Sequence, residues 1–157
     1  MGTLKGKTAI ITGGGRAVLS DGSCGSIGYG IATAYAKEGA NLVITGRNVK
    51  KLTDAKEELE EKYGIRVLPV QADISAGADN EALAESVAKQ AMEAFGRIDV
   101  LINNAQASAS GVTLADHTTE QFDLAVYSGL YATFHYMKAC YPYLKETKGS
   151  VINFASG

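Results

Sequence analysis

The chain has 157 residues, 46% of them hydrophobic and 20% charged, which is typical of a globular protein with one hydrophobic core. Fifteen Lys and Arg residues against 17 Asp and Glu give a net charge of −2, and this balance argues against nucleic acid as a partner. No apolar window is long enough for a signal peptide or a membrane span, so we expect a soluble, cytoplasmic protein that has no membrane partner.

Short apolar runs alternate with amphipathic segments along the sequence. Strands are predicted at 8–11, 42–45, 67–71, 100–102 and 150–154, and helices at 27–35, 49–63, 80–95 and 119–145. A capping box, Thr118 to Gln121, marks the start of the last helix. Continuously apolar strands separated by helices predict a doubly wound parallel α/β sheet of the Rossmann type, with three αβα layers. We expect residues 1–157 to form a single domain.

A glycine-rich segment separates the first predicted strand from the first predicted helix. It reads Thr-Gly-Gly-Gly-Arg at 12–16 and continues as Gly-Ser-Ile-Gly at 25–28. Glycines at this position let the backbone approach a pyrophosphate, whose charge then lies at a helix N-terminus. An ordinary connection between strand and helix is the alternative for this cluster taken alone. The cofactor-binding residues predicted in this segment are Gly13, Gly15, Arg16, Ser26, Ile27 and Gly28.

The end of the second strand indicates which dinucleotide is bound. An acidic residue there would bind a ribose 2′-hydroxyl, but the sequence at 45–48 is Thr-Gly-Arg-Asn and contains no carboxylate. The forked guanidinium of Arg47 suits a phosphate, and Arg16 could add a second positive contact. We therefore predict NADP(H) rather than NAD. The alternative is that both arginines are solvated surface charges.

Four motifs in order resemble the short-chain dehydrogenase/reductase family over the whole chain. They are the Thr-Gly loop, Asp73 after the third strand, Asn-Asn-Ala at 103–105, and the segment 149–156 at the fifth strand. The resemblance implies an oxidoreductase that transfers a hydride between NADP(H) and a small-molecule secondary alcohol or ketone. It also implies contacts with the cofactor: Asp73 would bond the adenine amino group, Ile74 would lie beside the adenine ring, and the cofactor cleft would be lined by Asn103, Asn104 and Ala105. The resemblance further implies that Ser156 is the catalytic serine, whose hydroxyl hydrogen-bonds the substrate oxygen.

The sequence departs from the family pattern at three places. Residues 17–25 are an insertion in the glycine-rich segment, so an enlarged and irregular phosphate loop is expected. Gln106 stands where the family has glycine after Asn-Asn-Ala. Gly129, on the last helix, stands where the family has a catalytic asparagine, and a water held by that asparagine is therefore in doubt.

The family also implies a Tyr-x-x-x-Lys pair after the serine, in which tyrosine transfers the proton. Tyr141 and Lys145 have the right letters, but they precede Ser156 and we interpret the match as accidental. The chain is interpreted as the amino-terminal, cofactor-binding part of such an enzyme, without the carboxy-terminal strands of the sheet. By itself it is predicted to be inactive. The last long helix commonly builds subunit contacts in this family, which implies a homo-oligomer.

Three functional hypotheses remain open at this point. Segments 26–32 and 103–111 are similar to the bacterial hydroxysteroid dehydrogenase branch of the family, which implies a steroid or bile acid as substrate. A non-catalytic NADP-binding module fits the residues present. An enoyl-thioester reductase is a third reading, because the segment 26–32 after a lengthened loop resembles that branch, although Asn-Asn-Ala argues against it. Cys24 and Cys140 are far apart, and neither histidine has a ligand at metal spacing, so no metal site is predicted.

Overall fold

The computed structural model describes residues 2–155, and its five strands form one parallel sheet in the order β3-β2-β1-β4-β5. Ile10 in the central strand is paired with Val43 on one side and Leu101 on the other. The central strand and its two neighbours are buried on both faces, as continuously apolar runs require in a parallel sheet, whereas the edge strand at 150–153 is exposed. The five predicted strands are confirmed, as β1 (Thr8–Thr12), β2 (Asn41–Gly46), β3 (Val67–Gln71), β4 (Val100–Asn103) and β5 (Ser150–Asn153).

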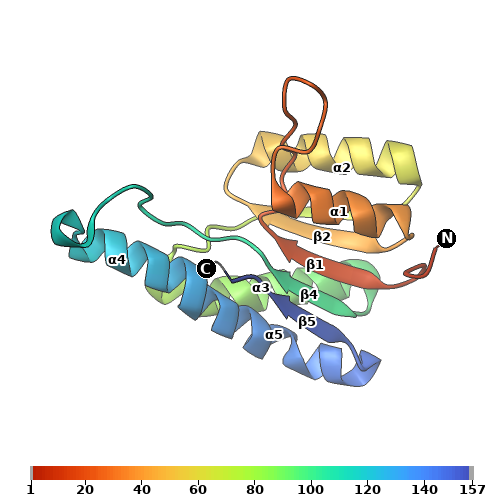
Figure 1. The fold of residues 1–157 in the computed structure, drawn as a ribbon. Coiled ribbons are helices and arrows are strands. Elements are labelled where there is room, and N and C mark those ends of the chain that lie inside the picture. The colour runs from red at the N-terminus through yellow and green to blue at the C-terminus, as the bar shows by residue number, and fades with distance from the viewer. Residues whose placement is uncertain (1, 156–157) are drawn as a thin grey trace.

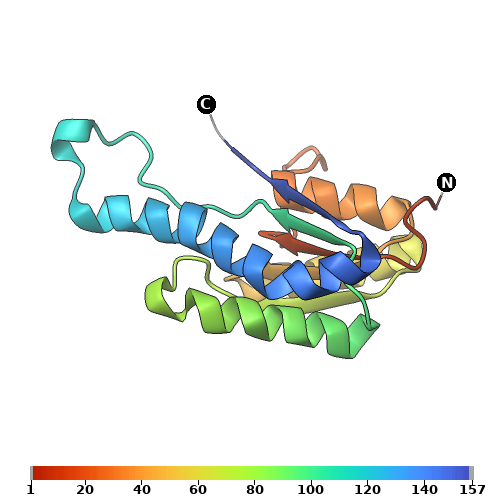
Figure 2. The ribbon, with the colours of Figure 1, turned by 90° about the horizontal axis from the view of Figure 1, so that it is seen from below.

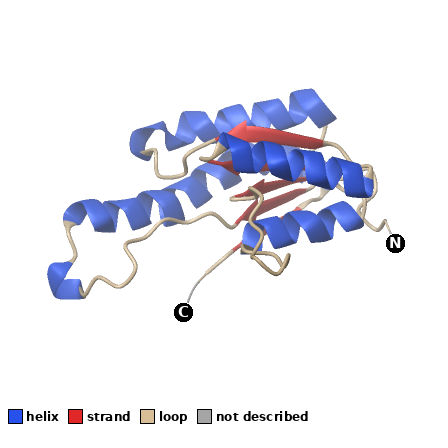
Figure 3. Ribbon diagram, turned by 90° about the horizontal axis from the view of Figure 1, so that it is seen from above, coloured by secondary structure: helices blue, strands red, loops and turns tan. Residues whose placement is uncertain are grey.

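Helices cover both faces of the sheet, which confirms the predicted three-layer, doubly wound architecture. Figure 1 shows α1 (Ile27–Lys37) and α2 (Val49–Tyr63) on one side and α3 (Asn80–Phe95) and α5 (Ala132–Thr147) on the other. Figure 3 shows the strands between these two layers. Neighbouring residues of β1 point to opposite layers: Ile11 packs in the core beneath α1 and α2, and Ile10 packs in the core beneath α3 and α5.

The predicted single helix at 119–145 is three segments. The capping box is confirmed, since Thr118 and Gln121 exchange two hydrogen bonds at the start of α4 (Thr119–Val126). A π-helical segment, η3 (Tyr127–Tyr131), follows and leads directly into α5, so the three parts extend as one rod beside the sheet (Figure 2). The buried Asn80 side chain donates to the carbonyl of Tyr127 at 3.1 Å. The wider turn is thus tied to α3, a tertiary contact that helical periodicity does not reveal.

The insertion at 17–25 is irregular, as expected, with no helix or strand beyond one isolated bridge. Its two ends are joined by a 2.7 Å hydrogen bond from the Gly25 N–H to the Ala17 carbonyl, and Val18 and Cys24 form an antiparallel bridge. In Figure 1 this segment projects away from the sheet beyond α1. Because the ends meet, the insertion closes on itself between Arg16 and Ser26.

Two further features bear on function. No helix among residues 2–155 is long and apolar enough to cross a membrane. Tyr141 and Lys145 lie in the last turns of α5, and this end of α5 leads into the start of β5. Both residues therefore lie near the amino ends of the strands, on the side of the sheet opposite the carboxyl ends. This placement agrees with interpreting their Tyr-x-x-x-Lys spacing as accidental. Two short 3₁₀ turns, η1 (Gly77–Asp79) and η2 (Leu114–Asp116), complete the described elements.

Candidate functional site

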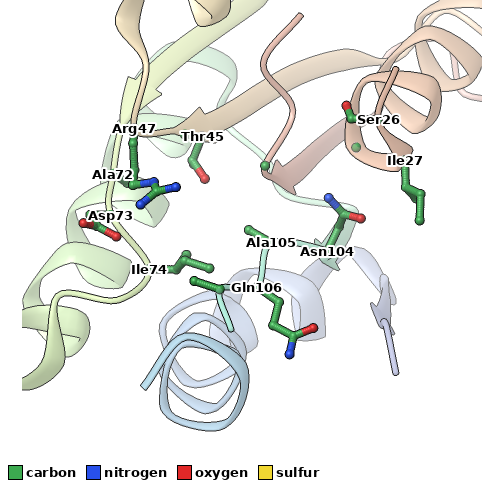
Figure 4. Close-up of a pocket in the computed structure, with 14 residues that line it drawn as sticks. Ser26, Ile27, Thr45, Arg47, Ala72, Asp73, Ile74, Asn104, Ala105 and Gln106 are labelled. Carbon is green, nitrogen blue, oxygen red and sulfur yellow. The ribbon is translucent and has the colours of Figure 1, made fainter. Parts of the chain in front are cut away.

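A cleft opens where the strand order changes direction. From β1 the chain builds the sheet outward through β2 and β3 on one side, and through β4 and β5 on the other. Connections that diverge in this way leave a crevice at the carboxyl ends of the strands. A cavity of about 380 Å³ lies there (Figure 4). The predicted site residues that line it are Gly13, Ser26, Ile27, Gly28, Arg47, Asp73, Ile74, Asn104 and Ala105.

The close approach of β1 and α1 at the base of the cleft requires glycine. Gly13 has a φ of 73°, a left-handed conformation that favours glycine. A Cβ on Gly28 would lie 2.0 Å from the Gly13 carbonyl oxygen, so any side chain would push the helix off the strand. Ser26 caps α1 by accepting from the Tyr29 N–H at 3.3 Å. The first turn of α1 therefore meets the cleft directly, and a helix N-terminus attracts phosphate.

Hydrogen bonds between β1 and β4 fix the opposite wall. The Thr12 hydroxyl accepts from the backbone N–H groups of Asn104 and Ala105, each at 3.0 Å, and the Asn104 amide donates to the Thr12 carbonyl at 3.0 Å. Asn103 is buried, and its amide donates to the Asn153 side chain of β5 at 2.9 Å. Asn103 and Asn104 thus hold the strand ends together. Thr12 belongs to the Thr-Gly loop of the sequence, but this structural role was not predicted from it.

Two cations border the cleft without a carboxylate partner among residues 2–155. Arg47 is exposed and lines the 380 Å³ cavity, and no salt bridge engages it in the described chain. Lys51, likewise unpaired there, lines an adjoining cavity of about 260 Å³ together with Arg47, Gly15 and Ser26. Lys51 was not predicted from the sequence. The available signal was its place in the first turn of α2, one turn after Arg47.

Arg16 does not reach the cleft in this structure. Its guanidinium pairs with the Glu58 carboxylate of α2, which also accepts from Lys62. Hydrogen bonds from Lys62 and Arg16 lower the pKa of Glu58 to about 2. Arg16 and Glu58 line a separate cavity of about 290 Å³ beside the insertion. The structure therefore gives no support to the predicted contact between Arg16 and a cofactor phosphate.

Asp73 presents an ionised carboxylate to the cleft. Its Oδ1 accepts from the Ser75 hydroxyl at 2.6 Å and from the Ser75 N–H at 3.0 Å, and these bonds lower the pKa of Asp73. The positive charge of Arg47 lowers that pKa further. Oδ2 has no hydrogen bond within residues 2–155 and is free to accept one from a ligand. Ile74 follows it and supplies an apolar surface on the same wall (Figure 4).

A second cavity of about 490 Å³ adjoins the first around the ends of β4 and β5. Its residues include Asn103, Gln106, Gly129 and Phe154. Gly129 comes from the π-helical segment, so the position where the family resemblance implies an asparagine does face this cavity. Ser156, the predicted catalytic serine, lies outside the described residues.

A family model described as short chain dehydrogenase matches residues 7–157. The chain belongs to this family, and the fold and the glycine-lined cleft at the strand ends agree with that assignment. Over all of its 157 residues the chain is 63% identical to a 12α-hydroxysteroid dehydrogenase from a Clostridium species, and it covers 58% of that relative's length.

Solved structures show the same architecture. L-sorbose reductase from Gluconobacter frateurii, determined with NADPH and L-sorbose, superposes with a TM-score of 0.84 at 29% identity; the match covers 99% of this chain and 55% of the reductase. An alcohol dehydrogenase from Thermococcus sibiricus, in complex with 5-hydroxy-NADP, gives a TM-score of 0.80 at 29% identity, covering 92% of this chain and 56% of that enzyme. The chain thus spans little more than half the length of these proteins.

Proposed function

We propose that the protein interconverts a secondary alcohol and a ketone with NADP(H), and that the substrate is a hydroxysteroid. The observation that carries the cofactor choice is the unpaired guanidinium of Arg47 at the end of β2, with Lys51 beside it and no carboxylate at 45–48. A ribose 2′-phosphate is attracted by this pair, whereas an acidic residue there would repel it. The steroid class is inferred from the 63% identical relative.

The cleft residues fit the parts of a dinucleotide. Gly13 and Gly28 form a cradle that any Cβ would fill, and the first turn of α1 faces it with free N–H groups. Asp73 offers a free carboxylate oxygen to the adenine amino group, and Ile74 offers the ring an apolar surface. Ala105 lies at the other end of the cleft, beside the 490 Å³ cavity, which we assign to the substrate. The nucleotide, when bound, supplies or takes up the hydride.

The catalytic role of Ser156 remains part of the proposal. Its hydroxyl would donate a hydrogen bond to the substrate oxygen and stabilise the charge that develops there. We also propose that a polypeptide of residues 1–157 alone binds NADP(H) without turnover, because the Tyr-x-x-x-Lys pair implied after this serine is not among them.

A homo-oligomer is proposed from the rod of α4, η3 and α5. Its outer surface carries large apolar side chains that are about half exposed or more in the single chain. Apolar surface of this kind is typical of subunit contacts. The residues are Phe122, Leu130, Tyr131, Phe134 and Tyr141.

The test is a reductase assay on the full-length protein, following NADPH consumption with a 12-ketosteroid, and with NADH as the control cofactor. We expect oxidation of NADPH that depends on the steroid and is much slower with NADH. Binding of NADPH without oxidation by any ketone would instead support a binding module. Reduction of an enoyl thioester faster than any ketone would support the enoyl-thioester reductase.

A further inference from the structure

Gln106 lies at the junction of the two cavities. Both the 380 Å³ cavity and the 490 Å³ cavity include it among their wall residues. Its side chain is exposed, and the carboxamide makes no hydrogen bond with any residue in 2–155. In Figure 4 the amide extends away from Arg47 and Asp73, the end of the cleft assigned to the adenosine. It is therefore a free donor and acceptor where a ligand in the second cavity would meet the nucleotide.

The loop that carries Gln106 is held by the π-helical segment. The hydroxyl of Ser128, which is buried, accepts from the Ala107 N–H at 2.9 Å and donates to the Ala107 carbonyl at 2.9 Å. The π-helical segment is in turn tied to α3 through the bond from Asn80 to the Tyr127 carbonyl. Both backbone groups of the residue after Gln106 are thus held, so the fold positions the backbone next to Gln106 before any ligand binds.

Gly129 leaves the room that the Gln106 side chain uses. A Cβ built on Gly129 would have one neighbour within 4 Å among the described residues, the Cγ of Gln106 at 4.0 Å. A longer side chain at position 129 would therefore extend into the space over the glutamine. The Gly129 carbonyl is already engaged, because it accepts from the Thr133 hydroxyl at 2.7 Å. What this part of the helix offers to the second cavity is space, and Gln106 beside it has an unengaged carboxamide.

We propose that the Gln106 carboxamide is a specificity-determining contact that hydrogen-bonds a hydroxyl or carbonyl oxygen of the substrate in the 490 Å³ cavity. The remaining wall is mixed, with apolar side chains from Ile27, Ala105 and Phe154 and polar ones from Asn103, Asn104 and Thr133. A ligand that has apolar surface and several oxygens matches this combination, since placed polar groups orient a ligand against the apolar part of a pocket. The inference rests on the proposed function, because it takes this cavity as the substrate site.

The test compares Gln106→Met, which keeps the length of the side chain and removes its hydrogen-bonding groups, with Ser108→Ala, a change at an exposed loop position outside both cavities. The full-length protein is assayed for kcat/KM with a 12-ketosteroid and for its Kd for NADPH. Gln106→Met is expected to lower kcat/KM by about 3- to 10-fold, the effect of losing one neutral hydrogen bond, with the NADPH Kd unchanged. Ser108→Ala is expected to change neither.

Gly129→Asn tests the shared space. The new side chain is expected to displace the glutamine and to lower kcat/KM about as much as Gln106→Met does. The double variant Gln106→Met/Gly129→Asn is expected to be no worse than either single change, because the effects of residues that compete for one space are not additive. Additive losses would contradict the arrangement.

Other outcomes overturn the inference separately from the proposed function. An unchanged kcat/KM in Gln106→Met excludes the contact, and a weakened NADPH Kd means that Gln106 binds the nucleotide instead. If the wild-type protein reduces no ketone, the proposed function fails. In that case the Kd of the same steroid is measured for the NADPH-bound protein. Gln106→Met must raise this Kd. No steroid binding, or equal binding by both proteins, overturns it.

Discussion

At the scale of single residues, Arg47 and Lys51 give the cleft its positive border, and both are free because no acidic side chain in the described chain pairs with them. Arg16 shows the contrast. It lies in the glycine-rich segment that would bind phosphate, yet Glu58 holds its guanidinium on the other side of the loop. Sequence position alone did not distinguish these arginines, because the distinguishing residue is 42 positions away.

Arg47→Ala is expected to weaken NADPH binding by about 10- to 100-fold, the effect of losing a charge-assisted hydrogen bond, and to leave NADH binding nearly unchanged. Titration of both nucleotides by fluorescence measures the two dissociation constants. Lys50→Ala is the matched control, since Lys50 is a neighbouring cation paired with Asp54 at 2.7 Å. Equal loss of NADPH and NADH affinity in Arg47→Ala would show that the guanidinium does not bind the 2′-phosphate.

Ionisation of Glu58 should make the stability of the fold fall with pH in the acid range. Its pKa is lowered from 4.5 to about 2 in the folded chain, so the ionised carboxylate stabilises the fold above pH 4.5, and this contribution is lost as the pH falls from 4.5 toward 2. Glu58→Gln removes the titrating group, and thermal unfolding between about pH 5 and pH 3 should then show a shallower fall in Tm. Glu57→Gln, at an exposed neighbour without an ion pair in residues 2–155, is the control. Parallel Tm curves for wild type and Glu58→Gln would refute the linkage.

At the scale of elements, the junction of β1 with α1 is the tightest packing in the cleft. Gly28→Ala places a Cβ against the Gly13 carbonyl and is expected to destabilise the protein by about 1–3 kcal/mol and to abolish nucleotide binding. Gly30 lies in the same helix, but a Cβ there would meet only the Cβ and Sγ of Cys24, each at 3.9 Å. Gly30→Ala is therefore expected to stabilise the helix by about 0.5–1 kcal/mol. Urea unfolding of both variants measures the difference. A Gly28→Ala protein with wild-type stability would contradict this geometry.

The elements could be predicted from the sequence where one local signal decided them. Apolar runs located all five strands, and the Thr118 capping box located the start of α4. The π-helical turn at 127–131 could not be predicted, because it depends on Asn80 and Ala107, which are distant in sequence. The closed form of the insertion depends on backbone bonds between its own ends, for which residue types give no signal. The cleft-lining glycines and Arg47 were predicted by their place after strands, and Asp73 by the family resemblance. Lys51 lay outside the motifs, and the Thr-Gly motif that contains Thr12 gave no sign of its hydrogen bonds to β4.

At the scale of the whole molecule, the rod of α4, η3 and α5 extends beyond the sheet (Figure 2) and exposes an apolar face. If this face joins subunits, Phe134→Glu should dissociate the oligomer, because a charge buried at an interface without a partner is costly. Phe134 is 54% exposed in the single chain, so the change has little effect on its own fold. Light scattering after gel filtration measures the mass of wild type and variant. A wild-type monomer, or an oligomer that Phe134→Glu leaves intact, would contradict the proposal.

The central claim is that the cleft binds a dinucleotide with a preference for the 2′-phosphate. The most direct measurement is a pair of dissociation constants, for NADPH and for NADH, determined by calorimetry on the wild-type protein under the same salt conditions. We expect NADPH to bind more tightly by about tenfold or more, the minimum effect of one charge-assisted contact. Equal affinities, or tighter binding of NADH, would contradict the assignment of Arg47 and Lys51 and with it the proposed cofactor.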